Sequence, residues 1–137
     1  MTYAGDLTPQ EAWDLLEQQA DALLVDVRTE AEWRFVGVPD PARLGKRPVL
    51  IEWATYPSMA RNEAFVDQLV ASGVKPGQPI VFLCRSGQRS IGAAEAATAA
   101  GLGPAYNILD GFEGATNLDG HRGTRGWKAE GLPWHQA

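Results

Sequence analysis

Cys84 and the polar residues that follow it have the types and spacing best suited to chemistry. Cys84 is the only cysteine in the 137 residues. The apolar run before it, residues 80–83, predicts a buried strand, and the alanine-rich run after residue 90 predicts a helix. A thiol between a strand end and a helix start lies near backbone N–H groups and the positive end of the helix dipole. These surroundings favour the thiolate, which is the nucleophilic form of cysteine.

The loop between this strand and this helix suits an anion. Gly87 lets the backbone curl so that successive N–H groups point inward. Arg85 and Arg89 add two positive charges beside the thiol, so a small anionic substrate fits the local charge. A polar loop of this kind is poorly suited to burial, which favours a reactive nucleophile over an inert core cysteine. We therefore expect a cradle around the sulfur made by Arg85, Ser86, Gly87, Gln88 and Arg89.

Two further groups of side chains are candidates for supporting this loop. Asp26 and Arg28 follow an apolar run and are two residues apart, so they share a face at the end of a predicted strand. Sites in open α/β sheets lie at the carboxyl ends of strands, so we expect this pair to form an ion pair that braces the loop. Trp53 and Tyr56 follow another apolar run. They either line the mouth of a pocket or pack in the core.

Composition and charge argue against several classes of function. Twelve basic and 17 acidic residues give a net charge of −5, which argues against a nucleic-acid partner. No apolar run approaches the roughly 20 residues of a membrane span, and no secretory signal is visible. His121, His135 and one cysteine match no familiar metal-ligand spacing, so we expect no metal and no other cofactor. A lone cysteine agrees with a reducing compartment, and we expect a cytoplasmic protein.

Strand and helix signals alternate along the chain. Thr8, Pro9 and Glu11 predict a helix start with a capping box, and Thr29 predicts the N-cap of a short helix at about 30–33. The remaining patterns predict strands at about 22–27, 49–53, 80–83 and 105–109, and helices at about 63–70 and 89–100. This alternation is typical of an α/β fold with a central, mostly parallel sheet and helices on both faces. We expect one domain over residues 1–137, with its core at about 8–134 and a Gly-rich stretch at about 116–126.

Four motifs occur in order along most of the chain, between Thr8 and Trp134. They are the strand end Asp26-Val27-Arg28, the loop Cys84–Ser90, the segment Asn107–Gly114 with its Asp110-Gly111-Phe112 turn, and the C-terminal segment Trp127–Pro133. Each motif is weak by itself, but the ordered set is specific. Together they resemble four motifs of the rhodaneses, the thiosulfate sulfurtransferase family. These are the Asp-x-Arg strand end, the active-site loop, the Gly-Gly-Phe segment and the C-terminal Trp…Gly-x-Pro motif.

The resemblance implies a two-step sulfur transfer in a single rhodanese-like domain. Cys84 would take a sulfane sulfur from a small anionic donor such as thiosulfate and hold it as a persulfide. A thiol or a protein acceptor would then remove the sulfur. Arg85 and Arg89 would bind the donor's sulfonate end, because guanidinium groups suit oxyanions. Asp26, Arg28 and Ser90 would support the loop.

Two departures from the family and two alternative functions stay open at this point. Asp110 replaces the first glycine of Gly-Gly-Phe, and the Gly-rich stretch intervenes before Trp127, which leaves the shape of one pocket wall open. One alternative is a sulfur carrier or redox-sensing module that serves a protein partner. The other is a phosphatase or arsenate reductase, but those enzymes place an arginine six residues after the cysteine. Here Arg89 is five residues after Cys84, which suits a single sulfur better than a tetrahedral oxyanion.

Overall fold

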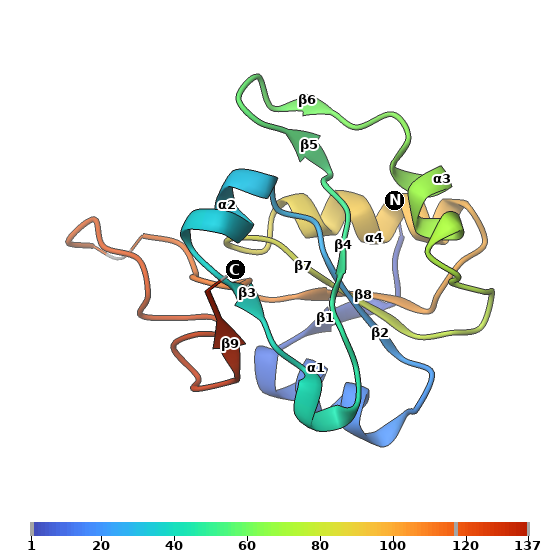
Figure 1. Ribbon diagram of the computed structural model, residues 1–137, viewed down its shortest axis with the longest axis horizontal. Coiled ribbons are helices and arrows are strands. Elements are labelled where there is room, and N and C mark those ends of the chain that lie inside the picture. The colour runs from blue at the N-terminus through green and yellow to red at the C-terminus, as the bar shows by residue number, and fades with distance from the viewer. Residues whose placement is uncertain (1, 117, 137) are drawn as a thin grey trace.

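A computed structural model describes residues 2–116 and 118–136 of the chain. At its centre is a five-stranded sheet in the order β1, β8, β7, β2, β4, and all neighbouring strands in it are parallel (Figure 1). The strands are β1 (Gly5–Leu7), β2 (Leu23–Asp26), β4 (Val49–Leu50), β7 (Ile80–Leu83) and β8 (Ala105–Ile108). The α/β class and the parallel central sheet that the sequence predicts are therefore confirmed.

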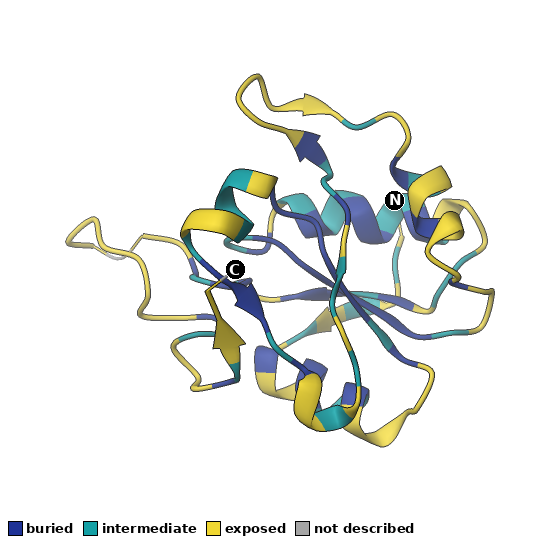
Figure 2. Cartoon of the chain, in the orientation of Figure 1, coloured by how far each residue is buried: buried dark blue, intermediate teal, exposed yellow. Residues whose placement is uncertain are grey.

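Helices cover both faces of the sheet, as predicted. Helix α1 (Pro9–Gln18) packs on one face, and α3 (Phe65–Ala71) and α4 (Arg89–Ala99) pack on the other (Figure 1). Successive side chains of a strand point to opposite faces, so Leu24 of β2 lies in the core under α1 and Val25 lies in the core under α3 and α4. All four residues of β7 are buried, which explains its unbroken apolar sequence (Figure 2).

Local capping sets two of the helix starts. Thr8 Oγ1 accepts the Glu11 N–H at 3.1 Å, and the Thr8 N–H donates to Glu11 Oε1 at 2.9 Å. The short helix α2 (Glu30–Phe35) begins in the same way, with Thr29 and Glu32 exchanging contacts of 3.3 and 3.1 Å. Each exchange satisfies backbone N–H groups that the first turn leaves without partners. The predicted capping box at Thr8 and the predicted N-cap at Thr29 are confirmed, and Glu32 adds a capping box at Thr29 that was not predicted.

Short strands account for most of the differences from the predicted elements. The run expected at 49–53 is a strand only at Val49–Leu50, although Ile51 still donates to the Asp26 carbonyl at 3.1 Å beside the end of β2. Strand β1 was not predicted, and neither were two antiparallel pairs: β3 (Val38–Pro39) with β9 (Trp134–His135), and β5 (Ala54–Thr55) with β6 (Ala60–Arg61). Elements of two or three residues carry too little periodicity to be recognised in a sequence.

Residues 118–125 of the Gly-rich stretch form an exposed loop, and the chain is buried again at Gly126 and Trp127 (Figures 1 and 2). Arg122 and Gly123 tie this loop to the carbonyls of Gly114 and Glu113, at 2.8 and 2.9 Å. Trp127 is fully buried, packs edge-on against Trp13 with ring centroids 5.8 Å apart, and donates to the Pro133 carbonyl at 2.7 Å. The inserted residues therefore do not displace this tryptophan from the core. Within the described part of the chain, no helix is long and apolar enough to cross a membrane.

Candidate active site

Cys84 lies at the carboxyl end of β7, directly before the loop that leads into α4. Its side chain is buried, with 1% of the residue exposed. The sulfur accepts a hydrogen bond from the Gly87 N–H at 3.1 Å. Gly87 has a φ of +96°, a conformation that favours glycine and turns its N–H back toward the sulfur. The amide and the start of α4 both stabilise negative charge on Cys84.

Ser90 connects the sulfur to a chain of polar side chains, through the buried Asn107 to the exposed Asp6, that the sequence did not reveal. Its hydroxyl lies 3.1 Å from Cys84 Sγ and donates to Asn107 Oδ1 on β8. Asn107 Nδ2 donates in turn to Asp6 Oδ1 on β1 at 3.0 Å, which orients the amide so that its oxygen faces Ser90. A hydroxyl has one proton to donate, so Ser90 accepts the Cys84 proton while the thiol is neutral. When Cys84 is ionised, its sulfur can accept a hydrogen bond from the Ser90 hydroxyl only if that hydroxyl stops donating to Asn107.

Ser90→Ala is expected to lower the free energy of unfolding by about 1–3 kcal/mol, because it leaves the buried oxygen of Asn107 without a donor. The matched control is Thr98→Ala on the same helix. Thr98 donates only to the Ala94 carbonyl one turn earlier, a bond worth little in a helix, so its loss should cost well under about 1 kcal/mol. Urea denaturation measures both variants. An equal decrease in the free energy of unfolding of the two variants would contradict a specific stabilising contribution of the Ser90–Asn107 hydrogen bond.

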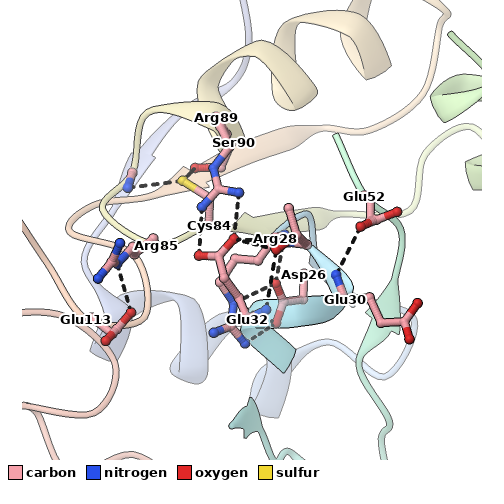
Figure 3. A network of polar contacts seen from close by, with 12 residues as sticks. Asp26, Arg28, Glu30, Glu32, Glu52, Cys84, Arg85, Arg89, Ser90 and Glu113 are labelled. Atoms are coloured by element: carbon pink, nitrogen blue, oxygen red, sulfur yellow. Dashed lines mark hydrogen bonds and ion pairs between the residues drawn. The ribbon is translucent and has the colours of Figure 1, made fainter. Parts of the chain in front are cut away.

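Arg85 and Arg89 lie at the mouth of the site, and each is paired with a carboxylate (Figure 3). Arg89 Nη1 and Nη2 donate to the two carboxylate oxygens of Glu32 on α2, at 2.8 and 2.9 Å. Arg85 Nε donates to Glu113 Oε2 at 3.0 Å. The local excess of positive charge expected from the sequence is therefore offset by Glu32 and Glu113. Ser86 is partly buried, and Gln88 is exposed just before α4.

Glu32 is held in its ionised form by its neighbours. Burial alone would raise its pKa, but hydrogen bonds from Arg89 and from the Thr29 backbone, together with the charges of Arg89 and Arg28, outweigh that effect. The net result is a pKa below the ordinary value of 4.5. The same pairing raises the pKa of Arg89 against the opposing effect of burial.

The lowered pKa of Glu32 gives a pH-dependent contribution to stability. This contribution is present above the ordinary pKa of 4.5 and is lost as the pH falls through the lower pKa of the folded state. We expect Glu32→Gln to lower the free energy of unfolding at neutral pH, with the difference from wild type shrinking as the pH drops below 4.5. Denaturant titrations over this pH range test it. Glu30→Gln on the same helix is the control, because its pair with Arg34 is exposed and screened by solvent.

Asp26 and Arg28 form the ion pair that their spacing suggested. Arg28 Nη2 lies 2.7 Å from Asp26 Oδ2, and both side chains are fully buried. Arg28 Nη2 also donates to the Gly37 carbonyl at 2.7 Å, and its guanidinium stacks 4.2 Å from the centroid of Phe112. The pair thus joins the end of β2 to the segment that follows α2 and to the Phe112 turn. This arrangement supports the expected bracing role.

The turn that contains Phe112 clamps the backbone of the Cys84 loop from the other side. The Phe112 N–H donates to the Cys84 carbonyl at 2.8 Å, and the Glu113 and Gly114 N–H groups donate to the Arg85 carbonyl at 3.0 and 3.1 Å. A side chain on Gly111 would collide with both carbonyls. Asp110, which stands where the resembled family has glycine, has a φ of +63°, so it adopts the left-handed conformation that aspartate tolerates better than most residues. The departure is thus accommodated by the turn.

The structure brings together the residues that the sequence singled out and adds several that it did not. Cys84, Gly87 and Ser90 are in direct contact, whereas Arg85 and Arg89 point to carboxylates instead of to the sulfur. The missed residues are Asp6, Glu32, Asn107 and Glu113. A polar asparagine inside an otherwise apolar strand was the one available signal for Asn107. Within the described residues, no cluster of three or more His, Cys, Asp or Glu side chains could hold a metal ion.

The sheet order, the cysteine loop at the end of a central strand and the clamping turn define the fold of a rhodanese-like domain. A rhodanese-like domain protein from Staphylococcus aureus has this fold, with a TM-score of 0.58 and 22% identity over 79% of this chain and 87% of that one. The chain itself belongs to the family described as STR4 middle domain, whose model matches residues 5–137.

Other proteins are similar over most of their length. Rv0390 from M. tuberculosis has a crystal structure with a TM-score of 0.92 and 56% identity, covering 99% of this chain and all of that one. The polysulfide-sulfur transferase homodimer of Wolinella succinogenes is 26% identical, with a TM-score of 0.66 over 95% of this chain and 77% of that one. An uncharacterized protein of Rickettsia conorii is 40% identical over 125 residues, which are 90% of this chain and 91% of that protein.

Proposed function

We propose that the protein is a sulfurtransferase that carries a sulfane sulfur on Cys84 as a persulfide. The observation that carries the proposal is the position of the Cys84 sulfur, held by the Gly87 amide at the start of α4. These groups stabilise a thiolate before transfer and the anionic persulfide after it. The likeness to the Wolinella succinogenes polysulfide-sulfur transferase supports the same kind of chemistry.

The first step is attack of the Cys84 thiolate on the terminal sulfur of a sulfane donor. A bond forms between Cys84 Sγ and that sulfur, the donor's S–S bond breaks, and its electron pair leaves with the rest of the donor. Thiosulfate would release sulfite in this way. The sulfur of Cys84 is almost completely buried, so a terminal sulfur atom is better placed to reach it than a hindered internal one.

The second step returns Cys84 to its thiolate. The thiolate of an acceptor attacks the outer sulfur of the persulfide, and the Cys84 sulfur leaves with the electron pair. Cys84 is the only cysteine of the chain, so an acceptor thiol has to come from another molecule. That thiol belongs either to a small molecule or to a protein.

The proposal is tested by incubating the purified chain with sulfane donors and measuring the intact mass. The expected result is a gain equal to one sulfur atom, located on Cys84 after digestion and removed by a reducing thiol. Protein alkylated at Cys84 beforehand is the control and should gain nothing. Absence of the adduct with thiosulfate, polysulfide and organic hydropersulfides alike would exclude the proposed function.

A further inference from the structure

The positive groups at the mouth of the site are already neutralised within the protein. Glu32 holds Arg89 through two hydrogen bonds, and Glu113 holds Arg85 through one (Figure 3). Both partners of the Arg89–Glu32 pair are mostly buried, with 21% and 18% of their side chains exposed, so solvent screens this pair less than a surface pair. In the second pair Glu113 is 15% exposed, but Arg85 is 43% exposed and therefore better screened. Two positive and two negative charges therefore cancel beside Cys84. A dianion such as thiosulfate would have to compete with Glu32 for both Nη groups of Arg89 and with Glu113 for Nε of Arg85.

The other side of the same mouth is apolar. An open pocket of about 380 Å³ adjoins both arginines, and its walls include Phe35, Val36, Tyr56 and Met59. Phe35 is 76% exposed and Tyr56 is 65% exposed, which is unusual for side chains of this size. Trp53, the other aromatic candidate from the sequence, instead packs edge-on against Phe65 under α3. The pocket is large enough for a small organic group, and its apolar wall suits one.

We propose that the sulfur donor is the hydropersulfide of an organic thiol with an apolar body, and that Glu32 and Glu113 determine this specificity by pairing the two arginines. The inference rests on the proposed sulfurtransferase function and names its substrate class. A hydropersulfide carries one negative charge or none, so it does not need the arginines to be free. Its carbon body would lie against Phe35, Tyr56 and Met59 while its terminal sulfur approaches Cys84.

The step balances without any further reactant. The Cys84 thiolate attacks the terminal sulfur of R–S–SH, the new bond joins Cys84 Sγ to that sulfur, and the bond to R–S breaks. The electron pair leaves on R–S⁻, and the proton remains on the transferred sulfur. The Cys84 sulfur is oxidised to the persulfide level, and the sulfur of R–S is reduced to a thiolate.

The experiment compares two donors, thiosulfate and benzyl hydropersulfide generated in solution. Mass spectrometry measures the rate of sulfur loading onto Cys84 for each donor. Each rate is divided by the rate at which the same donor reacts with free cysteine, which corrects for the intrinsic reactivity of the donor. In the wild-type chain we expect the corrected rate for benzyl hydropersulfide to exceed that for thiosulfate by about tenfold or more. A corrected rate that is higher for thiosulfate would overturn the inference.

Carboxylate variants test the pairing directly. Glu32→Gln and Glu113→Gln each free one arginine, so each should raise loading from thiosulfate by about tenfold while changing loading from benzyl hydropersulfide less than about twofold. Glutamine at position 32 retains the capping contact with Thr29. Glu30→Gln is the matched control, because it changes the net charge equally but lies in an exposed pair with Arg34. Unchanged thiosulfate loading in both site variants would contradict the role of the carboxylates.

A variant of the apolar wall provides the reciprocal test. Phe35→Ala should lower loading from benzyl hydropersulfide by about fivefold and leave thiosulfate unaffected, because the exposed ring contributes contact area to the carbon body alone. Equal losses with both donors would contradict an apolar donor site. Absence of any adduct with either donor, and with polysulfide as well, would instead exclude the sulfurtransferase function, so the two failures can be told apart.

Discussion

Cys84→Ser is expected to abolish sulfur loading and sulfur transfer from every donor. A serine hydroxyl at this position keeps the size of the side chain and can still accept the Gly87 N–H. It does not ionise near neutral pH and is a poor nucleophile toward sulfur, so no persulfide can form. The loss should be complete within the sensitivity of a coupled assay for released sulfite or thiol.

The folding of this variant supplies its control. The substitution replaces one small side chain by another, so the free energy of unfolding should fall by no more than about 2 kcal/mol, the cost of adding a buried hydroxyl. Circular dichroism should show the wild-type spectrum. Cys84 is the only thiol in the chain, so transfer that persists in a folded Cys84→Ser protein would contradict a persulfide mechanism.

Arg28→Met is expected to cause the largest loss of stability, about 3–5 kcal/mol, because it leaves the fully buried carboxylate of Asp26 without its partner. Arg28 donates to Asp26 through its backbone N–H, Nε and Nη2, and the side-chain contacts are lost. The Gly37 carbonyl also loses its donor. Chemical denaturation at neutral pH measures the change.

Two further variants separate the buried charge from simple loss of packing. Arg34→Met removes an exposed partner of Glu30 and should change the free energy of unfolding by less than about 1 kcal/mol. The double variant Asp26→Leu with Arg28→Met removes both charges and should recover much of the loss seen with Arg28→Met. If the double variant is no more stable than the single one, the loss comes from packing and the bracing role of the ion pair is wrong.

Features set by neighbours in the sequence could be predicted. The capping box at Thr8 and the N-cap at Thr29 depend only on residues close in the sequence, and both are present. The runs that became β2, β7 and β8 are mostly apolar and mostly buried because both faces of a parallel sheet are covered, and only β7 is apolar and buried throughout. The order of strand, Cys84 loop and helix follows from the same local signals.

Pairs between distant segments could not be predicted. Asn107 reaches Asp6 across 101 positions of the sequence, because β8 lies beside β1 at the edge of the sheet. Strand β1 has three residues and little pattern of its own, so nothing in the sequence indicated that it lies there. The polar chain from the exposed Asp6 through the buried Asn107 and Ser90 to Cys84 therefore became visible only when the strand order was known.

The local sequence by itself determined where the sulfur of the proposed nucleophile lies, since the strand, the glycine turn and the helix start are contiguous around Cys84. Only the tertiary structure decided the charge that an incoming donor meets. Glu32 is 57 positions from Arg89 and Glu113 is 28 positions from Arg85, and the packing of α2 and of the Phe112 turn brings them into contact. Electrostatic interactions depend on distance in space and on burial. The same two arginines could therefore have remained unpaired in another arrangement of these elements.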